Sequence, residues 1–208
     1  MPLRYRSELD ITGVAEVRAS GLTTAEAGTT AQMTLPRLLR ASESVDRIDD
    51  VAEALAHRLR RLLRNDIVDK TLRGAWIGHP AHPLLVTVPI GAWVCSAVFD
   101  LLGDRRAARR LVALGILTAP AAVVTGLAEF SRLSTVQRRV GLLHLLANLA
   151  AEACYLSSHR CRTRGSHGAG TLWSVLGLAA VATGGALGGH LSYALGAGVY
   201  EWQEGSEH

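Results

Sequence analysis

Four apolar stretches, each long enough to cross a membrane, follow one another along the last two thirds of the sequence. They cover about residues 83–102, 111–130, 140–158 and 171–195. An α-helix rises ~1.5 Å per residue, so ~20 residues cross a hydrocarbon core of ~30 Å. The connections between the stretches are short and basic, which makes consecutive helices antiparallel. The pattern predicts an all-α fold, namely an integral membrane, antiparallel four-helix bundle.

The first third of the chain has a different, polar pattern. Residues 1–73 hold 12 of the 22 Lys and Arg residues and 11 of the 18 Asp and Glu residues. Residues 1–40 show no sustained period, and we expect them to be irregular. From about 44 to 64, acidic residues come first, arginines come last, and four apolar residues recur at helical spacing: Val51, Leu55, Leu59 and Leu62.

We therefore expect an amphipathic helix in this polar, partly helical N-terminal region. Such a helix either docks on its own protein, lies on an anionic membrane face or pairs with a partner helix. The chain then divides into the N-terminal region (1–73), a four-span domain (74–200) and a short tail (201–208).

Composition narrows the protein classes further. The mean hydropathy is +0.20 and the formal net charge is +4. Residues 165–200 contain no Asp, Glu, Lys or Arg, which argues against a soluble enzyme and favours a non-enzymatic protein in contact with the lipid bilayer. Three cysteines without paired spacing exclude a disulfide scaffold. Basic residues between apolar runs are typical of membrane flanks and not of nucleic-acid binding.

The basic loops indicate the orientation by a small margin. Six basic residues lie near the end of the bundle that holds both termini, and seven lie near the other end. The end that holds the termini becomes the more basic one only when the arginines of the amphipathic helix are counted with it, and the more basic end is expected to face the cytoplasm. We expect a multi-pass protein of the cytoplasmic membrane with both termini on the cytoplasmic side.

Ionisable side chains in or beside the spans are the first candidates for function, because each costs roughly 2.5–3.5 kcal/mol to place in hydrocarbon. The order of the spans brings five of them to one leaflet, the one on the side of the termini. These residues are His79, His82, Glu129, His144 and His190.

The third span also carries a polar stripe. His144, Asn148, Glu152, Tyr155 and His159 fall within about 80° of one another at ~100° per residue. Such a stripe is costly against lipid, so it should face the bundle interior or a watery cleft.

The segment Gly78-His79-Pro80-Ala81-His82-Pro83 holds two histidines in a stiff turn. Each proline fixes its own φ and restricts the preceding residue to extended conformations. Neutral imidazole binds zinc and haem iron, and bundle cores house such sites between facing helices.

The cofactor this favours is a b-type haem, since a covalent c-type haem is excluded by the absence of a Cys-x-x-Cys-His run. A transition metal is an alternative, and so is no cofactor at all, with histidines that only cap backbone groups. The candidate ligands are His79, His82, His144 and His190, with Glu129 as an added carboxylate for a metal.

Small residues four positions apart mark the fourth span. They are Gly184, Gly185, Gly188 and Gly189, and they let another backbone approach closely. This face is predicted to pack on another helix of the bundle or on a second copy of the protein, which would make a homo-oligomer. A flat cofactor also needs such close approach.

The chain resembles a bacterial family of four-span membrane proteins of unknown function, domain of unknown function 2231. The resemblance rests on residues 72–83 with their double His-Pro turn, on Pro89-Ile90-Gly91 and Asp100-Leu101-Leu102, and more loosely on His144, Asn148 and Gly188-Gly189-His190. It covers roughly residues 70–200.

Some members of that family carry a C-terminal Rieske iron–sulfur domain, which implies a redox setting by association. This sequence has no Cys-x-His with Cys-x-x-His pair after Tyr200. An electron-transfer role would therefore need a separate Rieske-type or other redox protein as a partner.

Three functions remain open at this point. The first is a redox or electron-transfer accessory protein that binds b-type haem through membrane histidines. The second is a non-enzymatic membrane scaffold or complex subunit with structural histidines. The third is a transporter or proton pathway along the polar stripe, which would need oligomerisation because the chain has four spans and no apparent inverted repeat.

Overall fold

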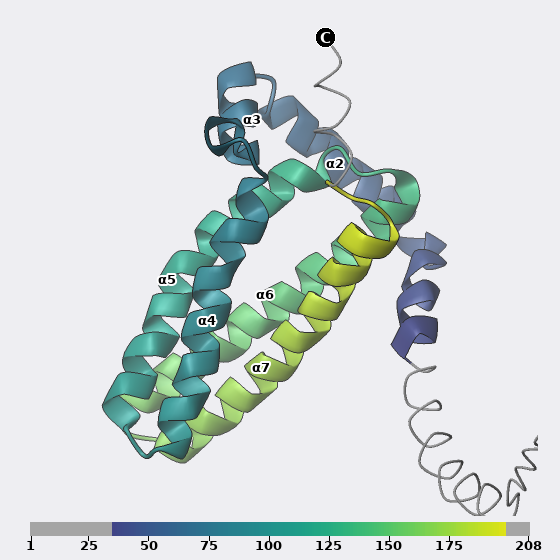
Figure 1. The fold of residues 1–208 in the computed structure, drawn as a ribbon. Coiled ribbons are helices and arrows are strands. Elements are labelled where there is room, and N and C mark those ends of the chain that lie inside the picture. The colour runs from purple at the N-terminus through teal and green to yellow at the C-terminus, as the bar shows by residue number, and fades with distance from the viewer. Residues whose placement is uncertain (1–34, 199–208) are drawn as a thin grey trace, which may run out of the picture. The chain divides into compact units, whose positions relative to one another are not determined.

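The computed structural model describes residues 35–198, and Figure 1 shows its helices. The chain divides into two compact units, Met1–Ala41 and Ser42–His208. In the first, residues 35–41 are helical. The rest of what we describe lies in the second unit. The sequence-predicted irregular segment falls almost wholly outside the described residues, as does the tail 201–208.

Four long apolar helices make up most of the second unit. Shorter helices precede and follow them, in the order η1 (Asp46–Ile48), α2 (Asp49–Leu62), α3 (Asp66–Arg73), η2 (Ala75–Ile77), α4 (Ala81–Leu101), α5 (Arg105–Phe130), α6 (Thr135–Thr163), α7 (His167–Gly189) and the π-helical η3 (His190–Ala194). All four long helices are long and apolar enough to cross a membrane. The predicted all-α, four-span bundle is confirmed.

The amphipathic helix is shorter than expected and is followed by a second helix. It ends at Leu62, and a new helix starts after Asn65, whose side chain accepts hydrogen bonds from the backbone N–H groups of Ile67 and Val68. An Asn at this position stabilises a helix start, so α3 runs as a separate element up to Gly74.

Helix α2 docks on the bundle itself. Ala52 and Ala56 are buried against Phe130 and Leu142, with Leu55 and Leu59 packed at the edge of the same cluster. Val51 and Leu62, which the spacing placed on the apolar face, are instead 62% and 76% exposed. The small alanines let α2 approach α5 and α6 closely, and this contact sets the rotation of the helix.

Within the bundle, α4 packs most closely on α5, and α6 on α7. The two hairpins meet through contacts of α5 with α6 and of α4 with α7, so α4 and α6 lie diagonally opposite. Their large side chains meet across the centre, where the rings of Trp93 and Tyr155 stack with centroids 4.2 Å apart. Both rings belong to the buried core together with Val112, Ala151 and Val181.

The two hairpins resemble each other when the sequence is compared with itself at an offset of 62 residues. Asp100 and Arg162, which bond across the centre, are 62 residues apart, and the same offset relates many other positions. The identical pairs at this offset include His82 with His144, Ser96 with Ser158, Gly103 with Gly165, Gly115 with Gly177 and Gly126 with Gly188.

Equivalent residues also make equivalent contacts. Ser96 donates to the carbonyl of Ala108, and Ser158 donates to the carbonyl of Gly170, each across 12 residues. Both turns between the helices of a hairpin hold a glycine at positive φ, 79° at Gly103 and 83° at Gly165. The repeat is parallel, with α4 equivalent to α6 and α5 to α7, so it differs from the inverted repeats of many transporters.

Candidate functional site

Two histidines from the two hairpins face each other at the end of the bundle where α4 and α6 begin. His82 lies in the first turn of α4 and His144 lies in α6. Their ring centroids are 6.3 Å apart and the ring planes cross at 82°. The two histidines occupy equivalent positions of the two hairpins, 62 residues apart.

Each ring is held by a backbone carbonyl of the partner helix in its own hairpin. Nδ1 of His82 lies 2.8 Å from the carbonyl oxygen of Ala122, and Nδ1 of His144 lies 2.8 Å from that of Gly184. A carbonyl oxygen can only accept a hydrogen bond, so both Nδ1 atoms donate. In the neutral rings this leaves the lone pair on Nε2, the arrangement that metal-ligating histidines adopt.

Glycines allow both rings to reach these carbonyls. A Cβ at Gly126 would lie 2.8 Å from Cε1 of His82, and one at Gly188 would lie 2.9 Å from Cε1 of His144. Any side chain at either position would therefore displace its histidine. The repeat preserves this close approach of ring and backbone in both hairpins.

Asn148 is the polar neighbour of the pair. Its Nδ2 lies 2.8 Å from the backbone carbonyl of His144 and 3.3 Å from Nε2 of the same residue. No described residue makes a hydrogen bond to Nε2 of His82. The pair therefore presents one unsatisfied and one weakly satisfied imidazole nitrogen.

The other two candidate histidines lie apart from this pair. His79 is exposed in the turn before α4. His190, at the start of η3, contacts the carboxylate of Glu43 at 2.8 Å. Of the four histidines that the sequence brought to one leaflet, the structure brings two together.

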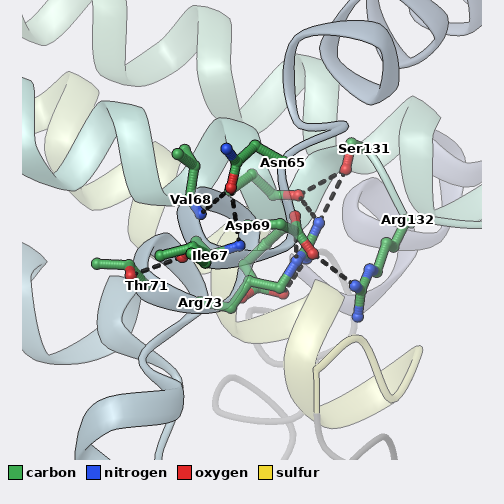
Figure 2. Close-up of polar contacts among 10 residues, drawn as sticks. Asn65, Ile67, Val68, Asp69, Thr71, Arg73, Ser131 and Arg132 are labelled. Atoms are coloured by element: carbon green, nitrogen blue, oxygen red, sulfur yellow. Dashed lines mark hydrogen bonds and ion pairs between the residues drawn. The ribbon is translucent and has the colours of Figure 1, made fainter.

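Glu129 belongs to a different cluster, the one around Arg73, and Figure 2 shows Arg73 with its labelled neighbours Asp69 and Ser131. Arg73, at the end of α3, is only 7% exposed and donates to the carbonyl of Ala128 at 2.6 Å and to Oγ of Ser131 at 3.0 Å. Its guanidinium also pairs with Glu129 at 3.3 Å and with Asp69 at 2.9 Å. The Glu129 carboxylate therefore balances Arg73 and does not join the histidines.

Of the predicted metal ligands, the structure brings His82 and His144 together and leaves His79, His190 and Glu129 elsewhere. Among residues 35–198, no three His, Cys, Asp or Glu side chains come close enough to hold a metal ion. A zinc or di-metal site needs three or four such ligands. A site that needs two histidines remains compatible with the geometry.

The polar stripe of α6 is divided among separate neighbours. His144 and Asn148 join the histidine pair, and Tyr155 is buried against Trp93. Oε2 of Glu152 and Nδ1 of His159 are shielded from solvent and lack a hydrogen-bond partner among the described residues. No hydrogen bond between described side chains links the stripe from one end to the other.

The glycines of α7 fall on two faces. A Cβ at Gly184 would meet Asn148 at 2.8 Å, and Gly188 lies against His144, so these two pack on α6. A Cβ at Gly185 or Gly189 would meet nothing within 4 Å. Packing within the bundle thus accounts for half of the glycine motif.

At the opposite end, sequence reasoning missed a buried ion pair. The Arg162 side chain is 0% exposed and donates twice to Asp100, at 2.7 and 2.5 Å. It also donates to Ser158 at 3.0 Å and to Ser174 at 3.1 Å. Comparing the sequence with itself at an offset of 62 would have placed Asp100 and Arg162 at equivalent positions of two hairpins.

Comparison with known proteins agrees with the membrane fold. A family model described as a predicted membrane protein (DUF2231) matches residues 78–201. No curated protein and no solved structure matches the chain.

Proposed function

The chain belongs to the DUF2231 family of predicted membrane proteins, and from this premise we propose that it is a redox or electron-transfer accessory protein that holds a b-type haem between His82 and His144. The observation that carries the proposal is the pairing of two histidines from equivalent hairpins with both Nδ1 atoms bound to carbonyls. A bound b-type haem supplies reversible one-electron transfer at its iron.

The donor set fits this group. His82 and His144 would hold the haem iron through Nε2, and each ring is oriented by the hydrogen bond from its Nδ1 to a backbone carbonyl. The 3.3 Å contact of Asn148 with Nε2 of His144 is the one that ligation would replace, and the shorter 2.8 Å bond of this amide to the backbone would stay.

Small residues of α5 and α7 surround the pair. The imidazoles of His82 and His144 fill the space that Gly126 and Gly188 leave open, so these glycines help to orient the two rings. Ala122 is buried one turn before Gly126, and Gly184 is buried one turn before Gly188. Both α5 and α7 thus present a small-residue surface to the histidines.

A soluble electron donor or acceptor would have to approach the haem from the membrane surface, at the end of the bundle nearer to the histidine pair. The pair lies near the starts of α4 and α6, and so near the end of the bundle to which α2 and α3 are attached. A separate Rieske-type or other redox protein is the partner class we propose, acting at this end. We further propose that this end faces the cytoplasm.

The test is a visible spectrum of the protein purified in mild detergent from a host supplied with a haem precursor. Reduced-minus-oxidised spectra of the wild type should show the Soret and α bands of a b-type cytochrome. His82→Ala and His144→Ala should each lose these bands. His79→Ala and His190→Ala should keep them, because neither side chain lies at the pair.

Two results would overturn the proposal. One is a wild-type protein that is colourless although the host is rich in haem, and the other is equal loss of haem in all four alanine variants. Size-exclusion chromatography and circular dichroism on each variant would separate loss of haem from loss of folding. A colourless, well-folded wild type would favour the scaffold function, in which the two histidines only cap carbonyls of α5 and α7.

A further inference from the structure

Three arginines and a histidine line one open hollow at the end of the bundle opposite the histidine pair. The hollow has a volume of about 220 Å³ and is formed by Arg105, Arg106, Arg109 and His167. The three arginines come from the first turns of α5, and His167 is the first residue of α7. The hollow therefore lies between the two hairpins.

The arginines of this hollow have no acidic partner in the part of the chain that the structure describes. The ion pairs among residues 35–198 include arginines at positions 60, 73, 132, 138, 139 and 162, but none of the three in the hollow. Three guanidinium groups around a small hollow repel one another, and an anion between them relieves that repulsion. The charge of the hollow therefore suits an anionic ligand.

Backbone groups add to this preference. The repeat places Arg105 and His167 at equivalent positions, so the N-termini of α5 and α7 both lie at the hollow. Asp104 caps α5 by accepting from two backbone N–H groups, whereas Ser166 makes no side-chain cap for α7. The first turn of α7 thus keeps backbone donors at the positive end of its helix dipole.

The side chains of the hollow also suit phosphate. His167, whose Nδ1 is shielded from solvent and has no hydrogen-bond partner among the described residues, lines the hollow together with the arginines. Arginine also matches phosphate geometry with two parallel hydrogen bonds.

From the hollow, its unpaired arginines and the uncapped start of α7, we infer that this end of the bundle binds a phosphate group. The ends of membrane-spanning helices lie at the depth of lipid headgroups, and basic pockets between such helices bind anionic lipids. The ligand is therefore the phosphate of an anionic phospholipid or free inorganic phosphate. This site is independent of the proposed haem.

The test compares two double variants of equal charge in delipidated protein. Arg105→Gln/Arg109→Gln removes two arginines of the hollow, and Arg160→Gln/Arg164→Gln removes two exposed arginines at the same end that do not line it. Native mass spectrometry measures binding of phosphatidylglycerol, with phosphatidylcholine as the neutral probe. Thermal unfolding measures the response to inorganic phosphate.

We expect the hollow variant to bind phosphatidylglycerol roughly tenfold more weakly for each arginine lost, the factor for one charge-assisted hydrogen bond. The control variant should bind within about threefold of wild type. If inorganic phosphate stabilises the wild type and the control variant but not the hollow variant, free phosphate is a ligand. If the wild type binds phosphatidylglycerol but is not stabilised by inorganic phosphate, the ligand is a lipid. Equal weakening in both double variants, or no binding of either probe by wild type, would overturn the inference.

Discussion

Removing the guanidinium of Arg162 should destabilise this protein more than removing any exposed charge. The side chain is fully buried and ties α6 to α4 through Asp100, and to α7 through Ser174. Arg162→Met keeps much of the volume and the apolar stem but deletes every hydrogen bond of the group. The Asp100 carboxylate, whose side chain is 9% exposed, would then lose the one cation that pairs with it among the described residues.

The magnitude follows from this burial. Breaking a buried ion pair by removing one partner costs about 3–5 kcal/mol, because the remaining charge stays desolvated. Replacing both partners by neutral groups is often nearly neutral. The double variant Asp100→Asn/Arg162→Met should therefore recover at least half of the loss and be about 2 kcal/mol more stable than Arg162→Met alone.

Unfolding by SDS in mixed micelles, followed by far-UV circular dichroism, measures these differences. Arg58→Met is the control, since Arg58 is exposed and no ion pair among the described residues includes it. We expect that control to remain close to wild type. An Arg162→Met protein within about 1 kcal/mol of wild type, or a double variant less stable than the single one, would refute the argument that the pair is buried and coupled.

Two further predictions concern packing and pH. A Cβ at Gly177 would lie 2.8 Å from the ring of Tyr155, whereas one at Gly185 would meet nothing within 4 Å. Gly177→Ala should cost about 1–3 kcal/mol in the same assay and Gly185→Ala should cost nothing, while equal effects would contradict the packing. Hydrogen bonds from Arg139 hold the pKa of Asp49 below its usual value, so this contact stabilises the fold above about pH 4 and is lost as the pH falls further. Lowering the pH below about 4 should thus reduce the Tm of the wild type more than that of Arg139→Gln. Parallel curves of Tm against pH for the two proteins would contradict this prediction.

The four spans were predictable because long apolar stretches alternate with short polar connections along the sequence. An apolar span can be recognised from its own residues, without knowing which helices it packs against, because lipid surrounds its outer surface and its backbone hydrogen bonds lie within the helix. The double His-Pro turn marked the start of α4, and the order of the spans placed the candidate histidines at one end of the bundle. The internal repeat was also present in the sequence, as identical residues 62 positions apart such as Gly115 and Gly177.

Only the tertiary structure decided which of these residues meet. The sequence determines how far along the bundle a residue lies, but the rotation of each helix depends on where large side chains find small ones. His82 and His144 turn inward because Gly126 and Gly188 make room for their rings. Glu129, which the order of the spans placed at the same end, turns to the guanidinium of Arg73, which comes from a helix that hydropathy did not predict. Ion pairs and ring contacts between distant segments are settled by packing, and the candidate site therefore came from the fold.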